Sequence, residues 1–172
     1  MGRPEEAPAP LGDASPFHFA VIVSRFNTEI TGSLRAAALE ALREAGAAGV
    51  EVYDVPGAYE IPQAARAAAE TGRVDAIVCL GCVIRGETPH FDYISSAVAH
   101  GIMEAAGETG VPMAFGVLTV DTLAQAQARA GAGSDNKGRE AAAAAIEMAG
   151  LYRRIEGERG RRRTGRAGRS ER

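Results

Sequence analysis

The feature that most constrains the fold of this chain is the regular alternation of short apolar runs with longer amphipathic segments. Four runs are typical of buried strands, because they are apolar and are bounded by turn residues. These predicted strands are residues 17–24, 49–57, 74–84 and 111–120. Segments with helical spacing of apolar residues lie between and after them. These predicted helices are residues 31–46, 60–70, 91–107, 122–131 and 136–155.

Strands that alternate with helices favour a parallel sheet covered on both faces and joined by right-handed crossovers. The predicted fold is a three-layer, flavodoxin-like α/β sandwich with a four-stranded parallel sheet in the order 2-1-3-4 and helices on both faces. Thr31 or Ser33 is expected to cap the first helix, and Gly46 to end it.

One folded domain is expected over residues 17–155. Residues 1–16 are rich in Pro, Ala and acidic residues, and residues 156–172 hold seven Arg against three Glu. Both ends lack apolar periodicity, so both are expected to be disordered.

Charge is segregated along the chain. The Arg-rich tail carries a formal +4, and because the whole chain carries −3, the remaining residues carry −7. A negative body gives no support for a nucleic-acid partner and favours a small-molecule substrate. The tail itself has two interpretations, a solvated segment or one that contacts a polyanion.

Cys79 and Cys82 stand three residues apart inside the apolar run "AIVCLGCVI". Side chains at that spacing on a strand point to opposite faces, so a disulfide or a shared metal is not expected. Two buried, reduced thiols indicate a reducing compartment. No signal-peptide core and no run of about 18 apolar residues occurs, so we expect a soluble, cytoplasmic protein without a metal site.

Polar loops follow all four predicted strands, where the ligand crevice of an open parallel sheet lies. Their sequences are "SRFNTEITG", "DVPGAYEIP", "IRGETPHFDYI" and "GVLTVDT". In the third loop Gly86 allows a bend, Glu87 and Thr88 present N–H groups, and a helix begins with Asp92 in its first turn. Such a turn attracts an anion, usually phosphate, although an ordinary strand-to-helix turn has the same outline.

Two further side chains in these loops are candidates for chemistry. His90, beside the anion turn, has an imidazole that can exchange protons near neutral pH, but a lone His is often a cap or a surface residue. Phe26 stands in a polar loop, where its ring could stack on a flat heterocycle instead of packing in the core.

The segments "SRFN", "VPGAYEIP", "GCVIRGETPHFDYI", "FGVLT" and "NKGREAAAAAIEMA" occur in the order and spacing found in lumazine synthases. The chain resembles that family over residues 17–155. The resemblance implies condensation of 5-amino-6-(D-ribitylamino)uracil with 3,4-dihydroxy-2-butanone 4-phosphate, which yields 6,7-dimethyl-8-ribityllumazine, phosphate and water in riboflavin biosynthesis. It implies no metal and no organic cofactor.

The resemblance also implies roles for individual residues. His90 is the proton-transferring residue. The implied substrate-binding residues are Phe26, which stacks on the pyrimidine, with Asn27 beside it; Ala58, Tyr59 and Glu60, at the ribityl chain; Cys82, Val83 and Ile84, through backbone groups; Glu87 and Thr88, at the butanone phosphate; and Phe115, Arg129 and Lys137, which the family draws from a neighbouring subunit.

A site split between subunits implies a homo-oligomer of pentamers. Whether it is a pentamer, a decamer or an icosahedral shell stays open, although the loop in "RAGAGSDNKG" has the length found in shell-forming members. Gly133 and Asp135 in that loop depart from a commoner Lys and Gly pattern, and the added carboxylate bears on phosphate binding next to Arg129. Tyr59 replaces a commoner Phe, a change read as neutral.

Two rival functions fit the same fold. One is a shell protein that holds a lumazine or flavin without making it, but such a binder needs no phosphate clamp of the kind implied by Arg129 and Lys137. The other is a flavodoxin-type electron carrier, which is disfavoured because the first loop is not a Ser/Thr/Gly-rich phosphate loop and the chain has no Trp.

Overall fold

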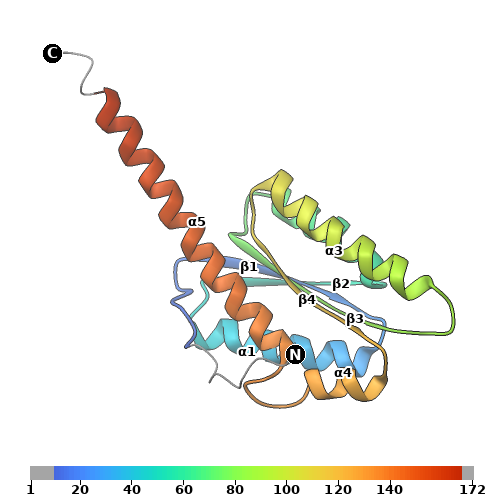
Figure 1. Ribbon diagram of the computed structural model, residues 1–172. Helices are drawn as coiled ribbons and strands as arrows, with labels where there is room; N and C mark the ends of the chain where they lie inside the picture. The colour runs from blue at the N-terminus through green and yellow to red at the C-terminus, as the bar shows by residue number, and fades with distance from the viewer. Residues whose placement is uncertain (1–9, 168–172) are drawn as a thin grey trace, which may run out of the picture.

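The central sheet of the computed structural model has four parallel strands in the order β2-β1-β3-β4 (Figure 1). They are β1 (His18–Ser24), β2 (Gly49–Val55), β3 (Ala76–Ile84) and β4 (Met113–Val120). The structure describes the backbone of residues 10–167 and the side chains of residues 10–158. The predicted parallel sheet and its strand order are confirmed.

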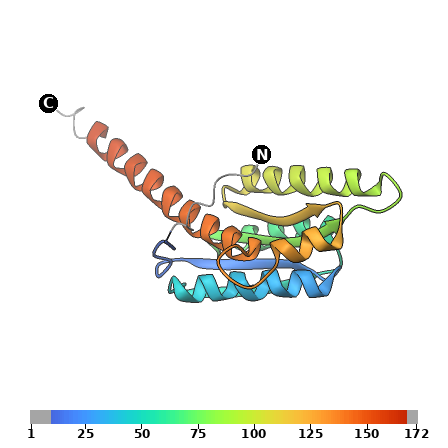
Figure 2. The same cartoon turned by 60° about the horizontal axis from the view of Figure 1, so that its bottom comes forward.

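Helices cover both faces of the sheet. They are α1 (Thr28–Glu44), the 3-10 turn η1 (Ala58–Glu60), α2 (Ile61–Glu70), α3 (His90–Thr109), α4 (Leu123–Arg129) and α5 (Lys137–Ala167). One apolar cluster joins the sheet to α1, α4 and α5, and a second joins it to η1, α2 and α3. Figure 2 shows the resulting layers, with α1 and α3 on opposite sides of the strands. The predicted three-layer sandwich is confirmed.

The two central strands explain why the sheet could be recognised in the sequence. Along β1, Val21 and Val23 face the first cluster, while Ala20 and Ile22 face the second. Strands buried on both faces read as continuous apolar runs instead of alternating ones. The same holds for most of β3, which is buried from Ala76 to Cys82.

The start of α1 differs from the predicted position. The helix begins at Thr28 with Asn27 at its N-cap position, so neither Thr31 nor Ser33 is the cap. The Thr31 hydroxyl bonds back to the Asn27 carbonyl at 3.4 Å, and the Ser33 hydroxyl donates to the Ala130 carbonyl at 2.5 Å. The Thr31 and Ser33 hydroxyls therefore donate to backbone carbonyls instead of capping the helix. Gly46, with φ +77°, lies just beyond the end of the helix as expected.

Both predicted tails contain ordered residues. Ala14 is fully buried, and its N–H donates to the Ala45 carbonyl at 3.0 Å, so residues 10–16 belong partly to the fold. Helix α5 extends through Ala167, into the segment for which disorder is expected from the sequence. Arg, Glu and Ala are good helix formers and extend the helix that the core begins. The remaining tail residues, 1–9 and 168–172, lie outside the described part of the chain.

Helices α1 and α5 approach each other closely. A Cβ atom added at Gly138 would stand 2.0 Å from the Leu34 carbonyl oxygen. The loop that precedes α5 is held by buried Asn136, which donates to the Gly131 carbonyl at 2.9 Å and accepts from the Gly138 N–H at 2.8 Å. These contacts fix where α5 starts. Within residues 10–167, no helix is long and apolar enough to cross a membrane.

We expect Gly138→Ala to destabilise the fold by about 1–3 kcal/mol, because its methyl group would collide with rigid backbone. Gly150→Ala is the matched control on the same helix, where an added Cβ meets nothing within 4 Å. It should be neutral or stabilising by up to about 1 kcal/mol, since Ala favours a helix over Gly. Thermal unfolding at equal protein concentration measures both. Equal midpoints for the two variants would contradict the close approach of α1 and α5.

Candidate active site

The main pocket lies at the carboxyl ends of β1 and β3. These strands are neighbours, and the chain leaves them toward opposite faces of the sheet, to α1 and to α3. A crevice is expected at such a switch point. The cavity has a volume of about 340 Å³. It is lined by Phe26, Asn27, Gly57, Ala58, Tyr59, Cys82, Val83, Ile84, Gly86, Thr88, His90, Phe91 and Ile94.

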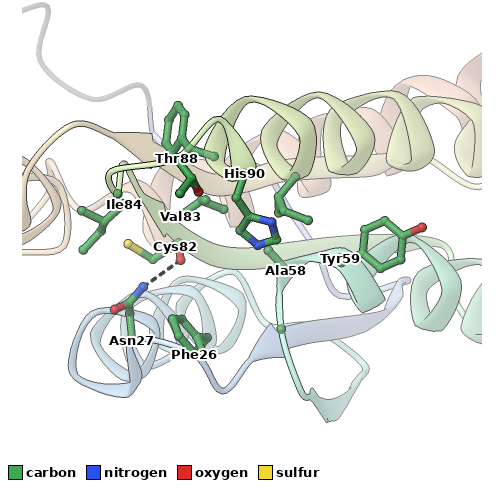
Figure 3. Close-up of a pocket in the computed structure, with 13 residues that line it drawn as sticks. Phe26, Asn27, Ala58, Tyr59, Cys82, Val83, Ile84, Thr88 and His90 are labelled. Carbon is green, nitrogen blue, oxygen red and sulfur yellow. Dashed lines mark hydrogen bonds between the residues drawn. The ribbon is translucent and has the colours of Figure 1, made fainter.

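Most of the candidate residues meet in this pocket. Phe26 and Asn27 come from the loop after β1, Ala58 and Tyr59 from η1, and the others from the end of β3 and the start of α3 (Figure 3). Gly57, Phe91 and Ile94 were not singled out in the sequence. Ile94 lies four positions after His90 and three after Phe91, and both spacings bring side chains to a shared side of α3.

Phe26 and His90 border the pocket from different layers. The Phe26 side chain is 71% exposed, which is unusual for a Phe and leaves a ring face open for stacking. The imidazole of His90 extends from the first residue of α3 toward Ala58 (Figure 3). A molecule in the cavity would thus contact an aromatic ring and a group able to transfer protons.

Asn27 ties the β1 loop to the end of β3. Its side-chain N–H donates to the Cys82 carbonyl at 3.0 Å, the dashed line in Figure 3. Its backbone is left-handed, with φ 60° and ψ 53°, a conformation that Asn tolerates better than most residues. Because Phe26 precedes it directly, this bond also limits where the Phe26 ring can lie.

Glu60 and Glu87 do not line the cavity within one chain. The carboxylate of Glu60 accepts a hydrogen bond from the Gly57 N–H at 2.9 Å and thereby shapes the η1 turn beside the pocket. Glu87 is exposed in the turn between β3 and α3.

That turn has the properties of an anion site. Among the described residues, the backbone N–H groups of Gly86, Glu87 and Thr88 find no hydrogen-bond acceptor. They precede the N-terminus of the 20-residue helix α3, where the helix dipole favours negative charge.

Arg85, at the base of the turn, is already paired. Its guanidinium binds both carboxylate oxygens of Asp92, at 3.2 and 3.1 Å, and one of Asp121 at 2.9 Å. Hydrogen bonds to Asp92 and then Asp121 raise the pKa of Arg85 further above its usual value.

The two cysteines have the environments expected from the sequence. Cys79 packs in the cluster with α2 and α3, and Cys82 in the cluster with α1 and α5, so their side chains occupy opposite faces. Both are free thiols. Burial raises the pKa of Cys79 to about 12 and that of Cys82 to about 11. The Cys82 thiol beside the cavity is therefore a weak nucleophile at neutral pH.

Phe115, Arg129 and Lys137 lie elsewhere. They line a second hollow of about 330 Å³ between β4, α4 and the start of α5. Arg129 donates to the Gln125 carbonyl at 3.1 Å, and Lys137 pairs with Glu140. Asp135 does not line this hollow and instead accepts a hydrogen bond from the Ser134 hydroxyl at 3.3 Å. The candidate residues thus form two separate groups in a single chain.

Comparison with known proteins gives a family that agrees with this geometry. The family described as 6,7-dimethyl-8-ribityllumazine synthase matches residues 16–153. The enzyme of that name from Syntrophus aciditrophicus (strain SB) is 51% identical over 139 residues, which cover 80% of this chain and 90% of that protein. The one from Salinibacter ruber (strain DSM 13855 / M31) is 53% identical over 141 residues, which cover 81% and 90%. This chain therefore belongs to the 6,7-dimethyl-8-ribityllumazine synthase family.

Proposed function

We propose that the pocket between β1 and β3 is where this chain carries out the lumazine synthase reaction of riboflavin biosynthesis. The observation that carries the assignment is the meeting of an exposed Phe26 ring, the His90 imidazole and an anion-accepting turn around one cavity. A flat pyrimidine, a proton transfer and a phosphate are the three things that the reaction must accommodate. Purified protein given both substrates should produce the absorbance of the lumazine.

The pyrimidine and the phosphate would occupy opposite parts of the pocket. The ribitylaminouracil ring stacks on Phe26, with its ribityl chain along Ala58 to Glu60. The phosphate of the butanone is received at the turn, by the backbone of Glu87 and by the backbone and hydroxyl of Thr88. Cys82, Val83 and Ile84 contribute backbone groups to the floor between them.

The chemistry requires alignment and proton movement. The amine and the ketone form an imine and lose water, phosphate is eliminated to give an enol, and after tautomerisation the second amine closes the ring with loss of water. His90 donates and accepts protons during these steps. Good orientation is worth up to about 7–11 kcal/mol, whereas a positioned acid or base contributes a factor of about 10²–10⁴. The pocket would act chiefly by alignment.

We propose that a second copy completes each pocket. Phe115, Arg129 and Lys137 form a hollow of their own, so they would serve the pocket of a neighbour in a homo-oligomer. Helix α3 exposes Tyr93 at 73% and Met103 at 75%, and β4 exposes Phe115 at 47%, which leaves apolar surface for subunit contacts. We propose that the assembly is at least a pentamer, and the length of the α4–α5 loop favours an icosahedral shell. We also propose that the enzyme is cytoplasmic, in keeping with its free cysteines.

Arg129→Ala should reduce activity more than His90→Ala. A planar guanidinium can donate two parallel hydrogen bonds to a phosphate dianion. Its loss therefore lowers the affinity for the butanone phosphate and also its alignment with the second substrate. Water can still move protons without His90. We expect His90→Ala to lower kcat by a factor of about 10² or less. Arg129→Ala should lower kcat/KM by a larger factor, with a large rise in the KM for the butanone phosphate. Steady-state kinetics after a check of assembly decide the order, and the reverse order would show that proton transfer limits the enzyme.

Co-assembly of His90→Ala and Arg129→Ala chains should restore activity if sites are shared between copies. In a ring mixed at random in equal amounts, about one site in four pairs an intact His90 with an intact Arg129. The mixed assembly should then reach about a quarter of wild-type turnover. Each variant alone, and the two stirred together after assembly, are the controls. Activity no higher than the mean of the two parents would place the whole site within one chain.

The Arg-rich segment after Ile155 is proposed to contact a polyanion. Residues 156–172 carry a formal +4, and an oligomer would multiply that charge. Deletion of these residues should leave turnover unchanged and abolish salt-sensitive binding of a single-stranded RNA. Replacing their Arg residues with Lys should preserve binding, and replacing them with Gln should abolish it. If the full-length protein binds no RNA at low salt, the segment has no such role.

A further inference from the structure

Arg85 stands at the phosphate end of the pocket, but its contacts are not those of a direct phosphate ligand. It opens the turn that carries Gly86, Glu87 and Thr88. An Arg in this position is the first candidate for a direct phosphate ligand, because a guanidinium binds phosphate oxygens in pairs.

The guanidinium is instead occupied within the chain. Two of its nitrogens hold the two oxygens of Asp92, and the third holds Asp121 at 2.9 Å. Its central carbon lies 4.2 Å from the centre of the Phe91 ring, a cation–π distance. Arg85 is also not among the residues that line the cavity, whereas Gly86 and Phe91 on either side of the turn are.

The same residue joins three elements. Its backbone N–H donates to the Val120 carbonyl at the end of β4, at 2.9 Å, and its side chain reaches the start of α3 and the loop before α4. The Asp121 N–H in turn donates to the side chain of Gln125 at 2.8 Å. The carbonyl of that Gln125 accepts from Arg129.

We propose that Arg85 is a positioning residue, which clamps the phosphate-receiving turn to α3 and to the start of α4. This proposal rests on the proposed function, since it takes the turn to be the phosphate site. Without this guanidinium, the turn would keep its backbone bond to β4 but lose its side-chain attachment to α3 and to the loop before α4. A single exposed ion pair contributes little, but a forked pair within a network is better ordered.

Arg85→Met should weaken phosphate binding without disturbing the pyrimidine. We expect a rise of about tenfold in the KM for the butanone phosphate and in the Kd for inorganic phosphate, the effect of losing roughly one charge-assisted contact. The KM for ribitylaminouracil should stay within about twofold. Arg85→Lys keeps the charge but cannot hold both carboxylates, so its KM for the butanone phosphate and its Kd for inorganic phosphate should stay close to those of Arg85→Met.

Asp121→Ala distinguishes a clamping role of Arg85 from direct binding of phosphate by Arg85. If Arg85 is a clamp, this variant raises the phosphate KM and Kd as Arg85→Met does, and the double variant is no worse than either single one. If Arg85 binds phosphate directly, Asp121→Ala frees its guanidinium and tightens binding, and this gain disappears in the double variant because Arg85 is then absent. Tighter binding or additive losses would overturn the proposal.

Arg73→Met is the matched control. Arg73 also forks onto a carboxylate, that of Glu51 at 3.2 Å, but it lies before β3, at the opposite end of the sheet from the pocket. Arg73→Met should leave the KM for the butanone phosphate and the Kd for inorganic phosphate unchanged. Inorganic phosphate binding, followed by calorimetry, needs no turnover. A wild-type protein that binds phosphate but forms no lumazine would therefore count against the proposed reaction and not against the clamp.

Discussion

The side-by-side pairing of β1 and β3 is the constraint on which the rest of this structure depends. The two strands pair in parallel from Phe19 and Ala76 onward, and the chain leaves them toward opposite faces of the sheet. Helices on both faces keep the strands buried, and a crevice forms at the carboxyl ends, where the two loops diverge to opposite faces. The pocket is therefore a consequence of strand order. The Asn27 bond to the Cys82 carbonyl then fixes the distance between the two loops that border it.

A second constraint sets the position of the other hollow. Gly138 allows α5 to lie against the backbone of α1, and Asn136 fills the hydrogen-bonding needs of the preceding loop. Arg129 and Lys137 stand at the two ends of that loop, so their separation follows from packing that has no catalytic part. Asn136 and Gly138, which line neither hollow, thus decide where the two cations lie.

The sequence allowed the sheet, the layers and most of the pocket to be predicted, because buried strands and rim loops leave local patterns. It did not locate the start of α1, since the Thr31 and Ser33 hydroxyls form bonds to a neighbouring turn and a distant loop that no local pattern reveals. Nor did it reveal that Ala14 fills a gap in the core, or that α5 continues to Ala167. Phe91 and Ile94 were missed because they resemble ordinary core residues of a helix, although the spacing of four residues between His90 and Ile94 was a usable signal.

The distribution of charge around the two hollows bears on how the enzyme would use assembly. The cavity with His90 and Phe26 has no lining Lys or Arg, and the guanidinium of Arg85, at the base of the turn, is paired with two carboxylates. A dianion at the turn would thus meet N–H groups and a helix dipole, but no Lys or Arg among the residues that line the cavity. Helix termini hold anions more weakly than paired guanidinium contacts do. In the assembly proposed above, Arg129, exposed at the end of α4, would supply the stronger cationic contact to a neighbour's pocket. An isolated chain would bind the pyrimidine and only weakly the phosphate, so that assembly itself would complete the enzyme.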